Sequence, residues 1–282
     1  MSNQKVKELL ENLEERIEKV QSSQEFKEYL RFFSKFHDYS YQNILLIKMQ
    51  KPSARLVAGY KQWQKKFDRH VKKGEKGIVI MAPYKYKKKV TEIKKDIVEG
   101  EIVEKEVEEE KEFVSFRPVY VFDISQTDGK DIPEWKIDIE EVENNLCDPL
   151  KSYAIKEGIV VDFKELRKGL NGYSEGGKIV VDESLNSTEK TSVLAHEIAH
   201  EKLHYDCKDK ELSKEIVELE AEATTFVVME YFNIDILSEK YLALYKKSHN
   251  LMDSFKRINR VSNEIIKGIL SQQIDVNNQR KC

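Results

Sequence analysis

The stretch His196-Glu197-Ile198-Ala199-His200 decides how the second half of this chain is built. The residues that lead into it, 187–195, contain no Pro or Gly, so the stretch continues a helix. Two histidines at i and i+4 of a helix project from one face and can bind one Zn²⁺. Glu197 lies beside them, where a carboxylate can accept a proton from metal-bound water. The stretch therefore predicts a zinc-dependent hydrolytic site on a helix.

A catalytic zinc site needs a third protein ligand and an open position for water. The helix predicted over residues 211–231 offers several acids. Glu218 and Glu222 are four residues apart and share one face, whereas Glu220 points the opposite way. We expect one of Glu218 and Glu222 to bind the metal and the other to orient a histidine, with Glu218 slightly favoured. The alternative is a solvated acidic face, but Ala223–Met229 is mostly small or apolar and predicts burial.

Other polar residues near the motif have weaker claims to a role. His204 follows His200 by four residues and is a candidate for polarising a substrate, although a structural neighbour is the commoner role for such a histidine. Tyr173 and Tyr205 are candidates for stabilising an oxyanion. The implied mechanism is metal-assisted hydrolysis, in which Glu197 takes a proton from the water and passes it to the leaving amine. Peptide hydrolysis is the usual outcome of this constellation.

Length and composition allow two domains and indicate a cytoplasmic protein. The chain has 282 residues, 40% of them hydrophobic and 35% charged, with a formal net charge of −3. The N-terminus lacks the apolar core of a signal peptide, and no stretch is long and apolar enough to predict a membrane span. Three cysteines without metal-type spacing, Cys147, Cys207 and Cys282, are typical of ordinary thiols in a reducing compartment.

The periodicity predicts an α+β protein with two domains, residues 1–128 and residues 129–282. In the first domain a charged insert, residues 84–112, alternates charge with Val and Ile and predicts a projecting β-hairpin. The second domain is expected to be mainly helical with a small sheet. The expected helices are 4–34, 43–49 and a short one from 59, and the expected strands are 78–83, 116–123, 158–161 and 178–182, with a linker region at 125–150.

Charge is unevenly distributed in the first domain. Residues 61–90 hold eleven Lys and Arg against two acids, whereas residues 91–112 hold ten acids against four lysines, which suggests distinct basic and acidic surfaces. Aromatic residues lie within or just before the basic block: Tyr39, Tyr41, Tyr60, Trp63, Phe67, Tyr84 and Tyr86. Bases that stack on aromatic rings while cations follow the phosphates are typical of single-strand binding, although such aromatics commonly belong to a core.

Several segments of the first domain resemble the N-terminal domain of ArdC-type antirestriction proteins. The matching segments are Tyr39–Ile47, Gln50–Pro52, Val57–Tyr60 with Trp63, Val71–Ile78, and Pro118–Asp123 with Gln126 and Thr127. The C-terminal half, with His196–His200 and Glu218–Ala223, is similar to the zincin domain of that family, which is related to ImmA/IrrE metallopeptidases. The order of the motifs also matches, so the resemblance covers nearly the whole chain.

The resemblance implies a single-stranded-DNA-binding domain joined to a zinc metallopeptidase-like domain, associated with antirestriction or mobile elements. The expected metal is Zn²⁺ and the expected partners are single-stranded DNA and an unknown protein substrate. The expected nucleic-acid contacts are Tyr39, Tyr41, Asn43, Tyr60, Trp63, Lys72, Lys73 and Lys76. Two departures stand out: Ala199 replaces a Gly that is frequent in related metallopeptidases, and the charged insert is longer than usual.

Two other functions stay open at this point. The first is a non-catalytic protein that coats single strands and holds zinc for structural or regulatory reasons. The second is a peptidase that cleaves a repressor, as in ImmA-like proteins. The intact Glu197 favours an enzyme, because a structural zinc site needs no base.

Overall fold

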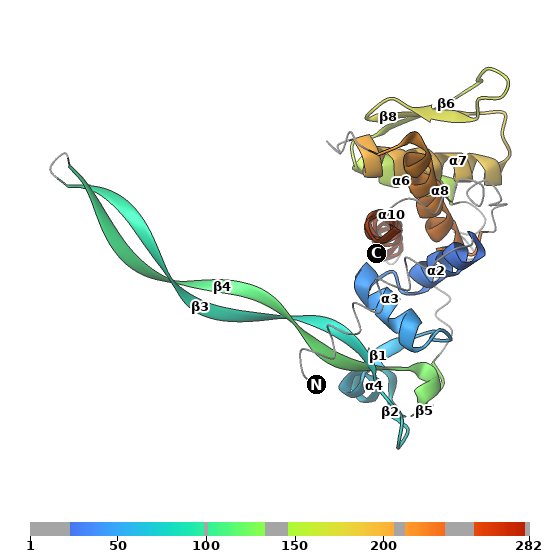
Figure 1. Ribbon diagram of the computed structural model, residues 1–282. Helices are drawn as coiled ribbons and strands as arrows, with labels where there is room; N and C mark the ends of the chain where they lie inside the picture. The colour runs from blue at the N-terminus through green and yellow to red at the C-terminus, as the bar shows by residue number, and fades with distance from the viewer. Residues whose placement is uncertain (1–22, 99–100, 133–145, 206–211, 235–250, 280–282) are drawn as a thin grey trace.

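The computed structural model describes residues 23–98, 101–132, 146–205, 212–234 and 251–279. Helices and small sheets form a body from which one long two-stranded β-ribbon projects (Figure 1). The predicted α+β class, with a β-hairpin insert in the first half and a mainly helical second half, is confirmed.

The N-terminal part consists of short helices around a three-stranded sheet. Its elements are α2 (Ser23–Lys35), α3 (Tyr41–Gln50), β1 (Val57–Gly59), α4 (Tyr60–Phe67), β2 (Arg69–Val71), β3 (Ile78–Val98), β4 (Glu101–Asp123), the 3-10 turn η1 (Ile124–Gln126) and β5 (Thr127–Gly129). The sheet has the order β1-β4-β3, and β2 pairs with β5 separately.

Helix α3 satisfies the outer edge of β3 with two amide side chains. The Asn43 amide donates to the Met81 carbonyl and accepts from the Met81 N–H, both at 2.9 Å. Two turns later, the Gln50 amide makes the same pair of bonds to Val79, at 2.9 and 3.0 Å. A bare strand edge invites pairing with other chains, so these amides close the edge of the sheet as a further strand would.

The ribbon is a continuous antiparallel pair in which Ile78 lies opposite Val121 and Val98 lies opposite Glu101. Its basic strand β3 faces its acidic strand β4, and cross-strand ion pairs follow. The Nζ–carboxylate distances are 2.6 Å for Lys85–Glu112, 3.4 Å for Lys87–Glu110 and 3.3 Å for Lys89–Glu108. Along the ribbon the basic and acidic blocks therefore neutralise each other, and the expectation of two distinct surfaces is wrong for this segment.

Asp123, fully buried at the end of β4, ties the sheet to the loop before β1. Its carboxylate accepts backbone N–H bonds from Arg55 at 2.7 Å, from Leu56 at 3.1 Å and from Ser125 at 3.0 Å. Burial works to raise the pKa of this carboxyl, but its hydrogen bonds outweigh burial and leave the pKa below its ordinary value.

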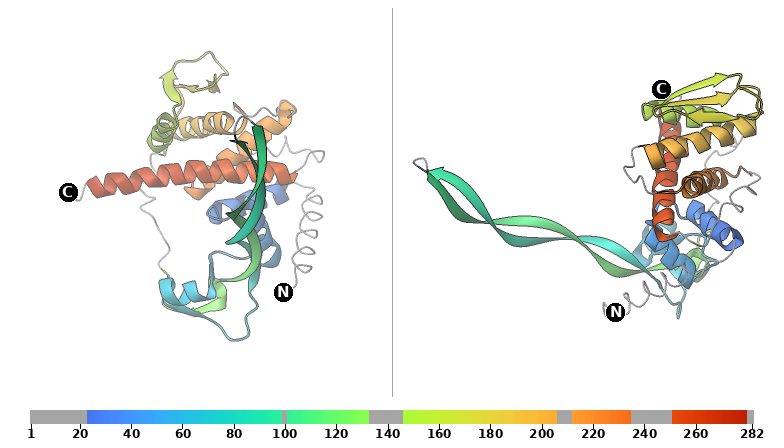
Figure 2. Two further views of the ribbon diagram at one scale, coloured as in Figure 1. Left: turned by 90° about the vertical axis from the view of Figure 1, so that its left-hand side faces the viewer. Right: turned by 45° about the horizontal axis from the view of Figure 1, so that its top comes forward.

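The C-terminal part places helices on one side of a small sheet (Figure 2). Its elements are α6 (Cys147–Lys156), β6 (Val160–Lys164), β7 (Gly172–Ser174), β8 (Lys178–Asp182), α7 (Ser187–His200), the π-helical turn η2 (Glu201–Tyr205), α8 (Lys214–Tyr231) and α10 (Leu251–Gln279). In the sheet order β6-β8-β7, β6 is parallel and β7 antiparallel to β8, so β7 forms one edge.

Gly172 allows the edge strand β7 to lie against α7. A Cβ at this position would be 2.5 Å from Cγ1 of Val193 on α7, and 3.7 Å from Cγ of Glu197. No real Cβ approaches a neighbour that closely, so the missing side chain is what brings β7 beside the motif helix.

Two buried clusters form the core, and the first is built by both halves of the chain. It joins Phe26 and Phe33 of α2 to Phe226 of α8 and Phe255 of α10, and the Phe26 and Phe255 rings stack with centroids 5.5 Å apart. The second cluster packs α6, α7, α8 and α10 against β6 and β8. The division of the chain at residues 128 and 129 stays a prediction, and helices from both sides of it share the first cluster.

Some expectations lie outside the described residues. These are positions 4–22 of the first helix, positions 133–145 of the linker region, and Cys207 and Cys282. Cys147 is a free thiol. Among the described helices, none combines the length and the apolar character that crossing a membrane requires.

We expect Asp123→Ala to lower the free energy of unfolding by about 2–4 kcal/mol, because it leaves the buried N–H groups of Arg55 and Leu56 without an acceptor. A carboxyl whose folded pKa is lowered stabilises the fold above its unfolded pKa, and this stabilisation is lost as the pH falls through the folded value. The unfolding free energies of wild type and variant, measured in urea, should therefore begin to approach each other as the pH falls below about 4. The exposed Asp128→Ala is the matched control, and an equal loss in both variants would contradict the role of Asp123.

Candidate metal centre and nucleic-acid surface

Helix α7 begins at a capping box and carries the motif in its last turns. The Asn186 side chain accepts from the Glu189 N–H at 2.9 Å, and the Glu189 carboxylate accepts from the Asn186 N–H at 3.2 Å. These bonds fix where the helix starts. His196 and His200 follow on one face, and the helix then widens into the π-helical turn η2. Such turns occur frequently at functional sites.

Three side chains from α7 and α8 converge on one point. The Nε2 atoms of His196 and His200 are 2.9 Å apart, and each lies 3.6 Å from Oε2 of Glu218. Together these three residues form a group whose candidate ligand atoms all lie within 4.8 Å of one another. Their side chains keep partial exposure, 19% for His196, 17% for His200 and 37% for Glu218, so the site is open to solvent.

The triangle fits a small divalent cation. A point equidistant from the three atoms lies about 2.0 Å from each, within the range of about 2.0–2.2 Å found for Zn–N and Zn–O bonds. A hydrogen bond between the two Nε2 atoms uses the lone pair of one histidine only, whereas a cation between them would be bound by the lone pairs of both. Three protein ligands on an open face also leave a fourth position for water, as catalytic sites require.

The histidine at the end of α7 has the protonation state of a metal ligand. Burial, followed by the neighbouring His196, lowers the pKa of His200 to about 4. Burial also works to lower the pKa of His196, but the hydrogen bond that its imidazole donates to Glu218 and the charges of Glu222 and Glu197 outweigh burial and raise the pKa. A metal ion, which binds only the neutral imidazole, would displace that proton.

Glu197 lies on the same helix turn, with 9% of its surface exposed. Burial raises the pKa of its carboxyl, and the charge of His196 and a hydrogen bond from Ser174 on β7 partly offset this. A carboxyl with a raised pKa accepts and returns protons near neutral pH more readily than an ordinary glutamate.

Glu222 lies behind the first histidine rather than at the converging point. Its Oε1 is 3.6 Å from Nδ1 of His196, the nitrogen that faces away from His200 and Glu218. That Nδ1 is buried and makes no hydrogen bond. Carboxylates in this position commonly orient a ligating histidine, so the geometry favours Glu218 as the ligand and Glu222 as the orienting group.

On the opposite face of α8, Glu220 is fully buried and turned toward α10. It accepts bonds from Nε and Nη2 of Arg257 at 2.8 and 2.5 Å, and from the Ser254 hydroxyl at 2.5 Å. His204 on η2 belongs to this group, since its Nε2 lies 3.8 Å from Glu220 and outside the His196 triangle. Sequence reasoning placed Glu220 on the far face but missed Arg257, because nothing local links two residues 37 positions apart.

The predicted nucleic-acid contacts do not form one exposed surface. Trp63 has no exposed area and donates its indole N–H to the Phe122 carbonyl at 2.9 Å, so it cannot offer a stacking face. The side-chain amide of Asn43 uses both its donor and its acceptor in hydrogen bonds to the Met81 backbone, as described above. These two residues serve the fold, which corrects the expectation. The half-buried Tyr39 and Tyr41 pack against the first core cluster.

The remaining four contacts lie at the surface. Tyr60 is 51% exposed, and the side chains of Lys73 and Lys76 are also exposed, in the turn between β2 and β3. The Lys72 ammonium is already engaged, because it donates to the Ser125 carbonyl at 3.1 Å and lies 3.6 Å from Asp128. Tyr60, Lys73 and Lys76 therefore remain available to a ligand.

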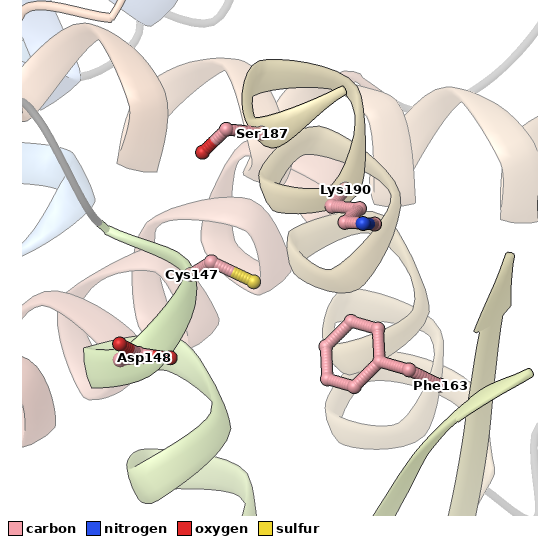
Figure 3. Close-up of a pocket in the computed structure, with 5 residues that line it drawn as sticks. All are labelled: Cys147, Asp148, Phe163, Ser187 and Lys190. Carbon is pink, nitrogen blue, oxygen red and sulfur yellow. The ribbon is translucent and has the colours of Figure 1, made fainter. Parts of the chain in front are cut away.

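A cavity of about 390 Å³ lies at the other end of α7, lined by Cys147, Asp148, Phe163, Ser187 and Lys190 (Figure 3). About ten residues of helix, roughly 15 Å, separate Ser187 from the motif histidines. Burial and the charge of Asp148 raise the pKa of the Cys147 thiol, which makes it a poor nucleophile. This cavity has no part in the metal centre.

Two family models match the chain in sequence. The model of the N-terminal domain of the anti-restriction factor ArdC matches residues 2–122. The model of the IrrE N-terminal-like domain, a peptidase family, matches residues 156–264 and so includes His196, His200 and Glu218.

One curated relative and two crystal structures of another protein show how far the likeness extends. An uncharacterised protein of Bacillus anthracis is 30% identical in an alignment 281 positions long. The alignment covers 85% of this chain but only 46% of that protein, so the chain spans about half of its relative. Two crystal structures of an antirestriction ArdC protein from plasmid R388 are also similar. The metal-free structure has a TM-score of 0.45 at 19% identity, over 85% of this chain and 86% of that one. The Mn(II)-bound structure has a TM-score of 0.44 at 16% identity, over 82% and 85%.

We expect Glu218→Ala to abolish stoichiometric binding of a divalent metal, and Glu222→Gln to weaken it about 10- to 100-fold, because only Glu218 faces both Nε2 atoms. Titration calorimetry with Zn²⁺ and with Mn²⁺ measures both effects. Glu230→Gln, at the far end of α8, is the matched control. The reverse ranking of Glu218 and Glu222 would overturn the assignment.

Proposed function

We propose that this chain is a metal-dependent peptidase that also binds single-stranded DNA. Residues 2–122 match the model of ArdC N-terminal domains, and residues 156–264 match the model of IrrE N-terminal-like domains. The observation that carries the proposal is the convergence of His196, His200 and Glu218 beside the buried Glu197. We propose an antirestriction or mobile-element role for the whole protein.

The donor set suits a divalent cation held by His196, His200 and Glu218, and we propose Zn²⁺. Two imidazoles and one carboxylate are a usual set for catalytic zinc. A cation bound there would supply Lewis acidity, which polarises a peptide carbonyl and makes water more acidic. Glu222 would hold the ring of His196 in the required orientation through Nδ1.

Glu197 is the proposed general base. It would take a proton from the attacking water and deliver it to the amine that leaves when the C–N bond breaks, so that its own protonation state is restored. The raised pKa of its carboxyl favours this return of the proton. A purely structural metal site would not need a buried carboxylate at this position, and this argues against a non-catalytic zinc.

The strand β7 offers a place for an extended peptide. It has β8 on one side only, and within the described residues no strand lies on its other side. Ser174 at its end reaches Glu197, and the turn that follows is held in place because the N–H groups of Gly176 and Gly177 donate to Glu201 at 2.9 and 2.8 Å. An edge strand fixed beside the proposed base can add a substrate as a further strand.

We expect Glu197→Gln to reduce cleavage of a mixed peptide library by about 100-fold or more while zinc binding is retained, because the amide cannot accept the proton. Cleavage products are measured by mass spectrometry on the zinc-loaded protein, with the exposed Glu183→Gln as the control.

Full cleavage by Glu197→Gln would remove Glu197 as the base. A protection assay against restriction in cells addresses the binding-only alternative. If Glu197→Gln protects incoming DNA as well as wild type does, protection requires no hydrolysis and the non-catalytic function is correct.

The ArdC-type N-terminal domain supports the proposed binding of single strands, and the exposed Tyr60, Lys73 and Lys76 are candidates for the contact. We expect Lys72→Ala/Lys73→Ala/Lys76→Ala to weaken binding of oligo-dT and to reduce the slope of log K against log salt by up to about 1.4. Lys73 and Lys76 are the lysines available to phosphates, and each lost phosphate contact removes about 0.7. Fluorescence anisotropy at several salt concentrations measures both quantities.

The control for this experiment removes three exposed lysines of the C-terminal part, Lys156, Lys164 and Lys168. An unchanged slope in the first variant, or an equal loss in both, would place the phosphate contacts elsewhere on the protein.

A further inference from the structure

The sheet β1-β4-β3 buries one face in the first core cluster. Its other face is covered at the body end, where Ala58 and Val79 are 5% and 3% exposed, and is open further along the ribbon. Ile78, Ile80 and Val121 point from the buried face into the first core cluster. Successive residues of a strand alternate between faces, so the neighbours of Val121 in β4 face outward. The outward residues, taken from the body along the ribbon, are Phe122, Tyr120, Pro118, Phe116 and Val114.

This open face carries an unusual amount of exposed apolar surface. Tyr120 is 48% exposed, Phe116 61% and Val114 58%. Tyr60, 51% exposed, extends the row, because its ring centroid lies 6.3 Å from that of Phe122 in an edge-to-face contact. Large aromatic side chains that remain exposed in a row, at a place where a core was available on the other face, indicate a binding surface.

A glycine makes room for this row. A Cβ on Gly77 would lie 2.8 Å from Cδ1 of Tyr120 and 3.1 Å from Cζ of Phe122, so both rings lie across the bare backbone of Gly77. This packing holds the two rings in place on the sheet. It also places the neighbouring Lys76, which is exposed, beside the row.

The charge along the row favours an anionic ligand. The residues of β3 opposite Tyr120, Pro118, Phe116 and Val114 are Val79, Met81, Pro83 and Lys85, so these registers contain one cation and no acid. Lys73 and Lys76 are exposed in the turn that leads to Gly77. Along β4 the next acid past Val114 is Glu112, which is paired with Lys85 at 2.6 Å. At the body end Glu75 accepts a hydrogen bond from the Gln126 amide at 2.9 Å.

We propose that Tyr60, Phe122, Tyr120 and Phe116 form a stacking track for the bases of a single-stranded nucleic acid, with Lys73 and Lys76 at the phosphates. This inference rests on the proposed binding of single strands and states which side chains carry it. From Phe122 to Phe116 the track measures about 20 Å along β4. That length accommodates a few nucleotides, at the lower end of the range of about 4–16 for such sites.

The ribbon itself supplies a matched control on its other face. Tyr84, Tyr86 and Phe113 are 39%, 41% and 36% exposed, and their rings contact one another, with centroids 5.9 Å apart for Tyr84–Tyr86 and 5.8 Å apart for Tyr86–Phe113. These rings are aromatic and lie on the same ribbon, but they pack together and face away from the track. Replacing them tests whether aromatic content alone is enough.

The experiment compares three triple variants of the full chain with wild type, by fluorescence anisotropy with oligo-dT of 4, 8, 12 and 16 nucleotides. Tyr60→Ala/Phe116→Thr/Tyr120→Thr should lose about tenfold or more in affinity at every salt concentration with an unchanged salt slope, because stacking is lost and phosphate contacts remain. Tyr84→Thr/Tyr86→Thr/Phe113→Thr should bind within about twofold of wild type. Tyr60→Phe/Phe116→Tyr/Tyr120→Phe keeps the rings and should restore affinity if the loss comes from stacking rather than from misfolding.

The outcomes separate this inference from the proposed function. If wild type binds and the lysine variant does not, while the Tyr60/Phe116/Tyr120 variant binds as wild type does, the track is wrong and the row serves another ligand, such as a protein. If the Tyr60/Phe116/Tyr120 variant and the Tyr84/Tyr86/Phe113 variant lose the same affinity for oligo-dT, the track is also wrong, because the loss then does not depend on which face of the ribbon carries the rings. If wild type binds no oligonucleotide, the proposed DNA function fails, and the track fails with it.

Discussion

The metal centre depends on one buried ion pair that lies outside it. The Glu220 carboxylate has no exposed surface, and an unpaired charge in that position would cost several kcal/mol. Arg257 and Ser254 of α10 supply its partners, so α8 cannot rotate about its axis without breaking three hydrogen bonds. Glu218 and Glu222 lie on the other side of the same helix, and the rotation that satisfies Glu220 is also the one that turns them toward the histidines of α7.

The sequence pattern correctly predicted which residues share one face of a helix. The spacing of His196 and His200, the shared face of Glu218 and Glu222, and the opposite direction of Glu220 all follow from 3.6 residues per turn. The sequence did not predict which distant residues each of these side chains would contact. Trp63 and Asn43 looked like exposed binding residues, yet one fills the core and the other pairs with the edge of β3. The basic and acidic blocks looked like two surfaces because their cross-strand pairing is invisible until the register of the ribbon is known.

Helix α8 lies between the two cores and belongs to both. Its Phe226 and Val227 pack with α2 and α3 in the first cluster, while Ala221, Val228 and Met229 pack in the second. Asn259 of α10 adds a polar link, because its amide donates to the Tyr39 carbonyl at 3.3 Å. The segment that carries a candidate metal ligand is thus held by residues from both ends of the chain, and a substitution that loosens α2 also affects the support of Glu218.

The alternating charges of the ribbon have a consequence for the behaviour of the protein at high concentration. Exposed ion pairs contribute little to folding, about 0–1 kcal/mol each, so Lys85–Glu112 and its neighbours do not explain why the ribbon is stable. They do change what its two long, unpaired edges can attract. A flat apolar strand edge recruits other chains and leads to aggregation, whereas lysines and glutamates at alternate positions must be stripped of water before a third strand can dock. The ribbon can extend far from the body because a further strand could pair with it only after these charged side chains had lost their water.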